Sequence, residues 1–144
     1  MATIKSYTDI EQSKKLAEIL PIESADMYYF LDPTPAGNIY HIVTTQIDFG
    51  VKTREPEYNK GDIPCWSLAA LLDVLPKTFN YNNHTYQFMY NTHAMYYINV
   101  DNYDEDTFCS TNKNLVDACY ELILKLNELN LLSLWIMKRN TKKL

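Results

Sequence analysis

Five short runs of aromatic and β-branched residues constrain the fold of this chain most strongly. They are bounded mainly by Asn, Asp, Gly and Pro, residues that favour turns and end strands. We interpret the first two runs as a hairpin and the last three as a meander. The runs are Met27–Leu31, Ile39–Phe49, Phe79–Tyr81, Tyr86–Tyr90 and Met95–Val100.

Helical signals lie on both sides of these runs. Near the start, Thr8 and Glu11 have capping-box spacing, in which the hydroxyl accepts a helical N–H and the carboxylate reaches back to the cap. This spacing predicts a helix over residues 9–20, ended by Pro21.

The strongest helical pattern follows Asn114, which is placed to cap a helix. Apolar residues recur there at helical spacing and predict a long C-terminal amphipathic helix. They are Leu115, Val116, Cys119, Leu122, Ile123, Leu126 and Leu129. Residues 131–137 either continue this helix or form an extended arm.

Residues 65–75 predict a further helix, with Pro64 in its first turn, where a missing N–H is no loss. Only Ser67 and Asp73 in this range are polar. A helix that is apolar nearly all round is either enclosed by the fold or presented to a partner.

The length of 144 residues suits one domain. We therefore expect residues 1–144 to form a single α+β domain, with an antiparallel sheet of four or five strands packed with two or three helices. There are only three glycines against twelve tyrosines, where average usage would give about ten glycines. Phosphate-binding loops built from glycine are therefore nearly excluded.

The net charge of −5 has the wrong sign for a broad nucleic-acid interface. Nucleic acid could bind only through the basic tail, residues 138–144, which we interpret as a solvated and frayed terminus. Its basic residues are Lys138, Arg139, Lys142 and Lys143. No apolar run has the length of a signal peptide or of a membrane span, so a cytoplasmic location is expected. Neither the three cysteines nor the three histidines have metal-site spacing, so no metal or cofactor is expected.

Three segments resemble a family of small uncharacterised proteins from Bacteroides-type gut bacteria, their phages and mobile elements. The resemblance covers the helical blocks and implies a bacterial or phage cytosolic setting. It implies no activity and no catalytic residues. The segments are Glu11–Pro21, Ile63–Leu72 and Asp117–Leu132.

One constellation suggests an enzyme. Cys65 at a helix start would have a lowered pKa. His93 could act as the base, with Asp101 or Asn102 orienting its imidazole. This order resembles that of papain-like thiol hydrolases. However, the family's small residues before the cysteine and its upstream Gln are missing, and a buried Cys behaves as a small hydrophobic residue.

We favour a non-catalytic binding or assembly module that contacts a protein partner or a second copy of itself. The contact would use a tyrosine-rich sheet face or the apolar helix 65–75, because tyrosine combines a large contact area with a polar tip. The alternative is that these tyrosines only cover the sheet. The candidate binding residues are Tyr28, Tyr40, Tyr86, Tyr90, Tyr96 and Trp66.

Overall fold

The computed structural model describes residues 5–44, 47–48, 51–52, 61–91, 94–102, 108–111 and 114–132. The chain is α+β, with antiparallel sheets and a C-terminal helix, as predicted. It forms two compact units. The N-terminal unit is Ser6–Ala70, and the C-terminal unit is Met1–Lys5 together with Leu71–Leu144.

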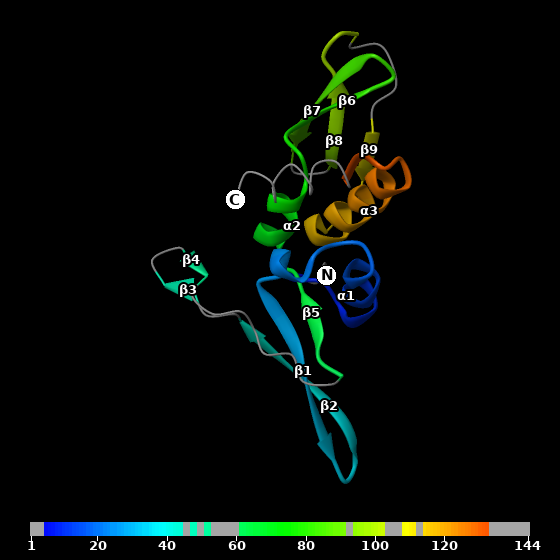
Figure 1. Ribbon diagram of the computed structural model, residues 1–144. Helices are drawn as coiled ribbons and strands as arrows, with labels where there is room; N and C mark the ends of the chain where they lie inside the picture. The colour runs from blue at the N-terminus through cyan, green and yellow to red at the C-terminus, as the bar shows by residue number, and fades with distance from the viewer. Residues whose placement is uncertain are drawn as a thin grey trace. The chain divides into compact units, whose positions relative to one another are not determined.

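A long hairpin dominates the N-terminal unit. Strand β1 (Met27–Thr34) pairs with β2 (Gly37–Thr44) on one side and with β5 (Ile63–Cys65) on the other. Strand β5 pairs only with Met27, Tyr28 and Tyr29 of β1, at the end of the hairpin far from its turn (Figure 1). The remaining short elements are η1 (Ile22–Ser24), β3 (Ile47–Asp48) and β4 (Val51–Lys52).

Helix α1 (Ile10–Ala17) packs against β5. Its capping box lies one residue later than predicted. The Asp9 side chain accepts the Gln12 N–H at 2.8 Å, and Gln12 Oε1 accepts the Asp9 N–H at 3.1 Å. Thr8 is instead fully buried, with its hydroxyl 2.7 Å from Ser13 Oγ. The cap moved because the Thr8 hydroxyl is engaged in the core and is not available to the helix.

Helix α2 (Leu68–Val74) is shorter than the predicted helix 65–75. Residues 63–65 pair with β1 and form β5 instead. The hydroxyl oxygen of Ser67 accepts the Ala70 N–H at 3.2 Å and so caps the start of the helix. Leu72 on this helix is 37% exposed, whereas Leu71 is fully buried. The exposed side of the helix carries Ala69, Leu72 and Asp73 and is thus largely apolar, in agreement with the prediction of a helix that is apolar nearly all round.

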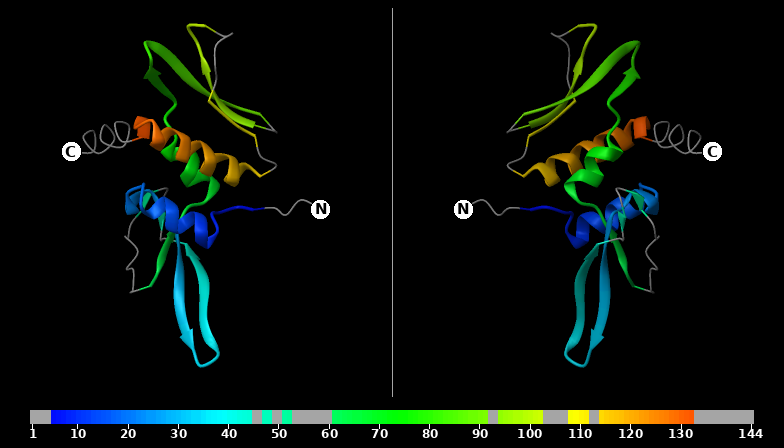
Figure 2. Two further views of the ribbon diagram at one scale, coloured as in Figure 1. Left: turned by 90° about the vertical axis from the view of Figure 1, so that its right-hand side faces the viewer. Right: turned by 90° about the vertical axis from the view of Figure 1, so that its left-hand side faces the viewer.

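A four-stranded antiparallel sheet forms the centre of the C-terminal unit, with α3 (Leu115–Glu128) against β8 and β9 on one face (Figure 2). Three strands match the predicted meander, whereas β9 was not predicted, because its Ser and Thr resemble a loop. The strands in sheet order are β6 (Thr78–Tyr81), β7 (His84–Tyr90), β8 (Ala94–Asn99) and β9 (Phe108–Thr111). The hairpin strands therefore lie in a separate sheet, whereas the sequence predicted a single one.

Asn114 caps α3 as predicted, since its side chain accepts the Val116 N–H at 2.9 Å. The apolar stripe faces the sheet, and Cys119 Sγ lies 3.1 Å from Met95 Sδ on β8. The helix ends at Glu128, and a left-handed residue follows it, Asn130 with φ of 60°. Leu131 and Leu132 are again helical. Residues 133–137 lie outside the described ranges, so the prediction for them stays untested.

Candidate functional site at the edge of the β1–β2 hairpin

A two-residue connection joins β1 to β2 and fixes their register. Thr34 lies opposite Gly37, and its hydroxyl donates to the Gly37 carbonyl. Gly37 has φ of +129°, a conformation that L side chains rarely adopt. The sequence analysis left residues 32–38 between the two predicted strands. In the structure the turn is only residues 35–36, and the other five residues belong to β1 or β2.

One hydrogen bond outside the hairpin establishes which backbone groups point outward. The Leu31 N–H donates to Asp62 Oδ1 at 2.9 Å, so it points away from β2. Leu31 lies opposite Tyr40. In an antiparallel ladder both members of such a non-hydrogen-bonded pair direct their N–H and C=O groups outward. Tyr40 therefore presents its backbone groups on the outer side of β2. The other β2 residues in the same phase are Asn38, Ile42 and Thr44.

Every outward N–H position of β1 is either paired or lacks a hydrogen. The first part of β1 pairs with β5, and Pro64 of β5 lies opposite Tyr28, where no ladder donor is needed. Further along, Asp62 occupies the Leu31 N–H, and Pro33 has no N–H to offer. A Cβ added to Gly61 would lie 2.4 Å from Leu31 Cδ2. The absence of a side chain thus lets this backbone approach β1 closely.

Within the described ranges, no residue protects the outer side of β2 in these ways. Among the described residues no strand pairs with it. Residues 37–44 also contain no Asp, Glu, Lys, Arg or Pro, the residues with which proteins usually protect a free edge. Ile39 in the middle of the strand is 48% exposed. The hairpin therefore has one closed edge and one open edge.

The two faces of the hairpin differ in their surroundings. On one face, Tyr40 and Ile42 pack against the buried cluster that contains Met27, Tyr29 and Cys65. On the other face, His41 stacks on Phe30 with ring centroids 6.3 Å apart, and its Nε2 lies 3.1 Å from Asp32 Oδ2. One face of β2 is thus anchored to the buried cluster, and its other face carries the His41 ring and its contact with Asp32.

Cys65 does not lie at a helix start, as predicted, but at the end of β5. It is fully buried, and its thiol donates to the Thr8 carbonyl at 3.4 Å. Burial raises the pKa of the Cys65 thiol, and hydrogen bonds from the neighbouring hydroxyls only partly oppose this rise. Its thiol is therefore inaccessible and protonated near neutral pH. The prediction of an activated thiolate at this position was wrong.

The other two residues of the enzyme hypothesis do not assemble a site either. His93 lies outside the described residues. Asp101 belongs to the C-terminal unit, where its Oδ2 accepts the Thr85 N–H at 2.8 Å and lies 3.8 Å from His84 Nδ1. Asp101 thus fixes the start of β7.

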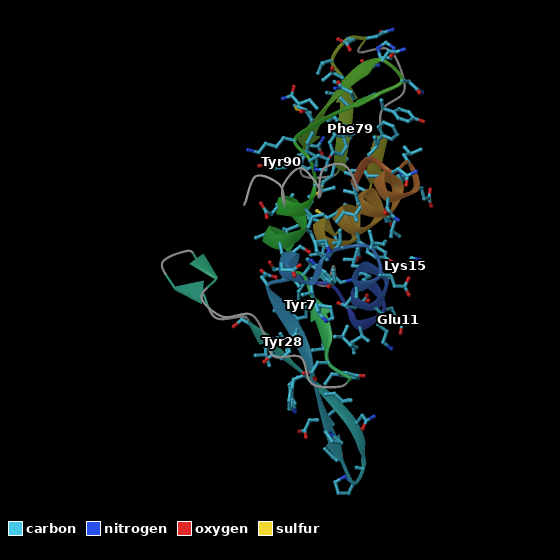
Figure 3. All side chains as sticks on the ribbon, in the orientation of Figure 1. Tyr7, Glu11, Lys15, Tyr28, Phe79 and Tyr90 are labelled. Atoms are coloured by element: carbon cyan, nitrogen blue, oxygen red, sulfur yellow. The ribbon has the colours of Figure 1, made fainter. Side chains whose placement is uncertain are left out.

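The candidate tyrosines do not form one face. Tyr40 pairs with Leu31, so these two side chains share a face of the hairpin. Tyr28 lies three residues before Leu31 on β1, and because side chains alternate along a strand it points to the opposite face. Tyr86 and Tyr96 similarly lie on opposite faces of the C-terminal sheet. Figure 3 marks Tyr28 on β1 and Tyr90 at the end of β7. The prediction of a single tyrosine-rich face was therefore wrong. The composition of a strand does not determine which of its residues point to a given face of the sheet.

Burial separates these residues further. Tyr86 is only 6% exposed and stacks on Phe79, with ring centroids 5.3 Å apart. Trp66 is fully buried, and its Nε1–H donates to Ser24 Oγ at 2.9 Å. Both residues stabilise the interior and offer no surface to a partner. Tyr90 is 68% exposed, and Tyr40 lies on the open edge.

No group of three His, Cys, Asp or Glu residues in the described ranges could hold a metal ion. Within the same part of the chain, no helix has both the length and the apolar character needed to cross a membrane. The basic tail, residues 138–144, lies outside the described ranges.

Comparisons with protein-family models, with curated proteins and with solved structures found no match to this chain.

Nothing in the sequence marked Asp62, Gly61 and Pro33 as residues that protect one edge of the hairpin. A signal for the open edge was present, because residues 37–44 are strand-like and contain neither charge nor proline. The sequence does not determine which N–H groups of β2 point outward. The hydrogen bond from the Leu31 N–H to Asp62 establishes this, because Leu31 pairs with Tyr40.

Proposed function

We propose that this protein is a non-catalytic binding module that adds an extended segment of a protein partner to the outer edge of β2. The observation that carries this proposal is the difference between the two edges of the hairpin. Asp62 and Pro33 protect the edge of β1, whereas no such protection of β2 occurs in the part of the chain that the structure describes. Strand addition to an open sheet edge is a common mode of peptide recognition.

The chemistry of recognition follows from the register. Outward N–H and C=O groups of β2 would give sequence-independent hydrogen bonds to an extended chain. Alternate side chains would contact the two faces of the added strand. Tyr40 and Ile42 offer apolar contacts on one face, and Ile39 and Val43 offer them on the other. The preferred partner segment is therefore extended, apolar on both of its faces and free of proline.

The alternative of a papain-like thiol hydrolase receives no support from the geometry around Cys65, which is buried with a raised pKa. A bacterial or phage cytosolic setting, which the family resemblance implies, is compatible with a strand-binding role and is part of the proposal.

Selection from a random peptide display library tests the proposal without a known partner. The full chain is compared with a variant carrying Asn38→Pro and Thr44→Pro, which removes two outward N–H groups from exposed positions. A second variant with Asn38→Ala and Thr44→Ala keeps both N–H groups. Peptides selected on the unmodified chain should bind the alanine variant and fail on the proline variant. Equal binding to all three proteins, or no selected peptide, would contradict the proposal.

A further inference from the structure

We infer that a second copy of this chain occupies the open edge, with the two β2 strands paired antiparallel about a twofold axis at His41. The inference rests on the proposed function, because it requires the same open edge. It adds the identity of one occupant and the register in which it binds.

The backbone selects this register. Only outward-facing residues can form hydrogen-bonded pairs across the new contact, and these are Asn38, Tyr40, Ile42 and Thr44. An antiparallel arrangement centred on His41 places Asn38 opposite Thr44 of the second copy, and Tyr40 opposite Ile42 of the second copy. Every outward group is then paired, which gives about eight inter-strand hydrogen bonds, two for each pair. A shift of the centre to Tyr40 or Ile42 leaves outward groups unpaired.

The side chains are complementary to themselves in the same register. On one face, Tyr40 meets Ile42 of the second copy, an aromatic and β-branched pair of the kind that stabilises sheets. On the other face, Ile39 meets Val43 of the second copy. Both apolar contacts occur twice because of the symmetry.

The charge distribution favours a like-with-like contact at this strand. The chain carries a net charge of −5, so two copies repel each other wherever their acidic surfaces meet. Residues 37–44 contain no Asp, Glu, Lys or Arg. The acid nearest to His41, Asp32, is directed at its imidazole from the neighbouring strand, with 3.1 Å between Oδ2 and Nε2. The edge of β2 therefore permits the approach of two acidic molecules.

Sedimentation equilibrium over a wide concentration range tests the association. The unmodified chain should show a concentration-dependent dimer. The variant with Asn38→Pro and Thr44→Pro should raise the dimer dissociation constant by at least about tenfold, since it removes about half of the inter-strand donors. The variant with Asn38→Ala and Thr44→Ala should dimerise like the unmodified chain. A dimer that survives the proline substitutions unchanged would overturn the inference.

Disulfide cross-linking tests the register. In a Cys109→Ser background, His41→Cys places two thiols at a non-hydrogen-bonded pair with about 4.5 Å between Cα atoms, which suits a disulfide. Ile39→Cys is the matched control, because its two copies would lie about 13 Å apart along the strands. Mild oxidation should cross-link the first variant and not the second, and the reverse result would refute this register.

The association experiments and the peptide selection can give different results, so they test the two proposals separately. A chain that stays monomeric at every concentration, yet binds peptides that the proline variant rejects, would overturn self-association and leave the strand-binding function standing. Failure of both experiments would remove both.

Discussion

The Asp62 carboxylate accepts the Leu31 N–H at 2.9 Å across 31 positions of sequence and closes the edge of β1 beyond β5. Replacing Asp62 with Ala should reduce the free energy of unfolding by about 1 kcal/mol, because the partly buried N–H then lacks a protein acceptor. Asp62→Asn keeps an oxygen acceptor and should retain most of the stability. Urea denaturation of the three proteins measures the difference, and an Asn variant as unstable as the Ala variant would point to a role for the charge.

Gly61 and Gly37 both have positive φ, but only Gly61 lies against a side chain. Ala at either position should destabilise the protein by about 1 kcal/mol through backbone strain. Gly61→Ala should lose more, because its Cβ would displace the end of the Leu31 side chain, whereas nothing lies within 4 Å at Gly37. Thermal denaturation of both variants gives the comparison. Gly61→Ala combined with Leu31→Ala should remove the steric part of the Gly61→Ala loss in a double-mutant cycle.

The thiols should differ in their reactivity toward iodoacetamide in the native protein at neutral pH. Cys109 is partly exposed, whereas Cys65 and Cys119 are buried. Cys109 should be alkylated first, and the other two should react only when the protein is unfolded in denaturant. Mass spectrometry of digested samples reports each site. Labelling of native Cys65 at the rate of Cys109 would revive the thiol hydrolase hypothesis.

The free energy of unfolding should fall at high pH, because buried cysteine thiols and tyrosine hydroxyls must lose their protons there. Burial raises the pKa of the Cys119 thiol from 9.0 to about 12, so the unfolded chain loses this proton at lower pH than the folded chain does. The contribution of Cys119 is thus fully present below pH 9 and is lost between pH 9 and 12, at about 1.4 kcal/mol per pH unit. Burial also raises the pKa of Cys65, Tyr29 and Tyr97.

Denaturation curves collected from pH 7 to 11 check this expectation. Cys119→Ala should be less stable at neutral pH, because it leaves a cavity beside Met95, but its stability should fall less steeply above pH 9. An identical alkaline slope in the two proteins would mean that Cys119 ionises equally in the folded and unfolded chains.

Local patterns predicted the elements better than their assembly. The apolar spacing after Asn114 locates α3, since that helix is amphipathic along its whole length and carries its own cap. The capping box near Thr8 was displaced by one residue, because tertiary contacts bury Thr8 and leave Asp9 to cap the helix. Cys65 and Trp66 were assigned to a helix on the strength of the aliphatic residues that follow them. Cys65 instead pairs with β1, and the Trp66 backbone exchanges hydrogen bonds with Thr8.

The candidate site was only half accessible to sequence reasoning. Tyr40 was predicted to bind a partner through its aromatic ring. In the structure its outward backbone N–H and C=O groups lie on the open edge of β2. Tyr86 and Trp66 were identified and prove to be buried. Whether a strand residue faces solvent or core depends on its phase relative to its neighbours, and a shift by one residue reverses it.

The closure at Gly61 and Asp62 also sets how far association of the hairpin can proceed. A sheet with two free edges can add molecules at both ends and grow into a fibre. In the described part of the N-terminal sheet, the proline and the occupied N–H on β1 leave no second long edge for such growth. In the proposed dimer, pairing at β2 would occupy the long open edge of this sheet, so this contact by itself would not extend beyond two molecules.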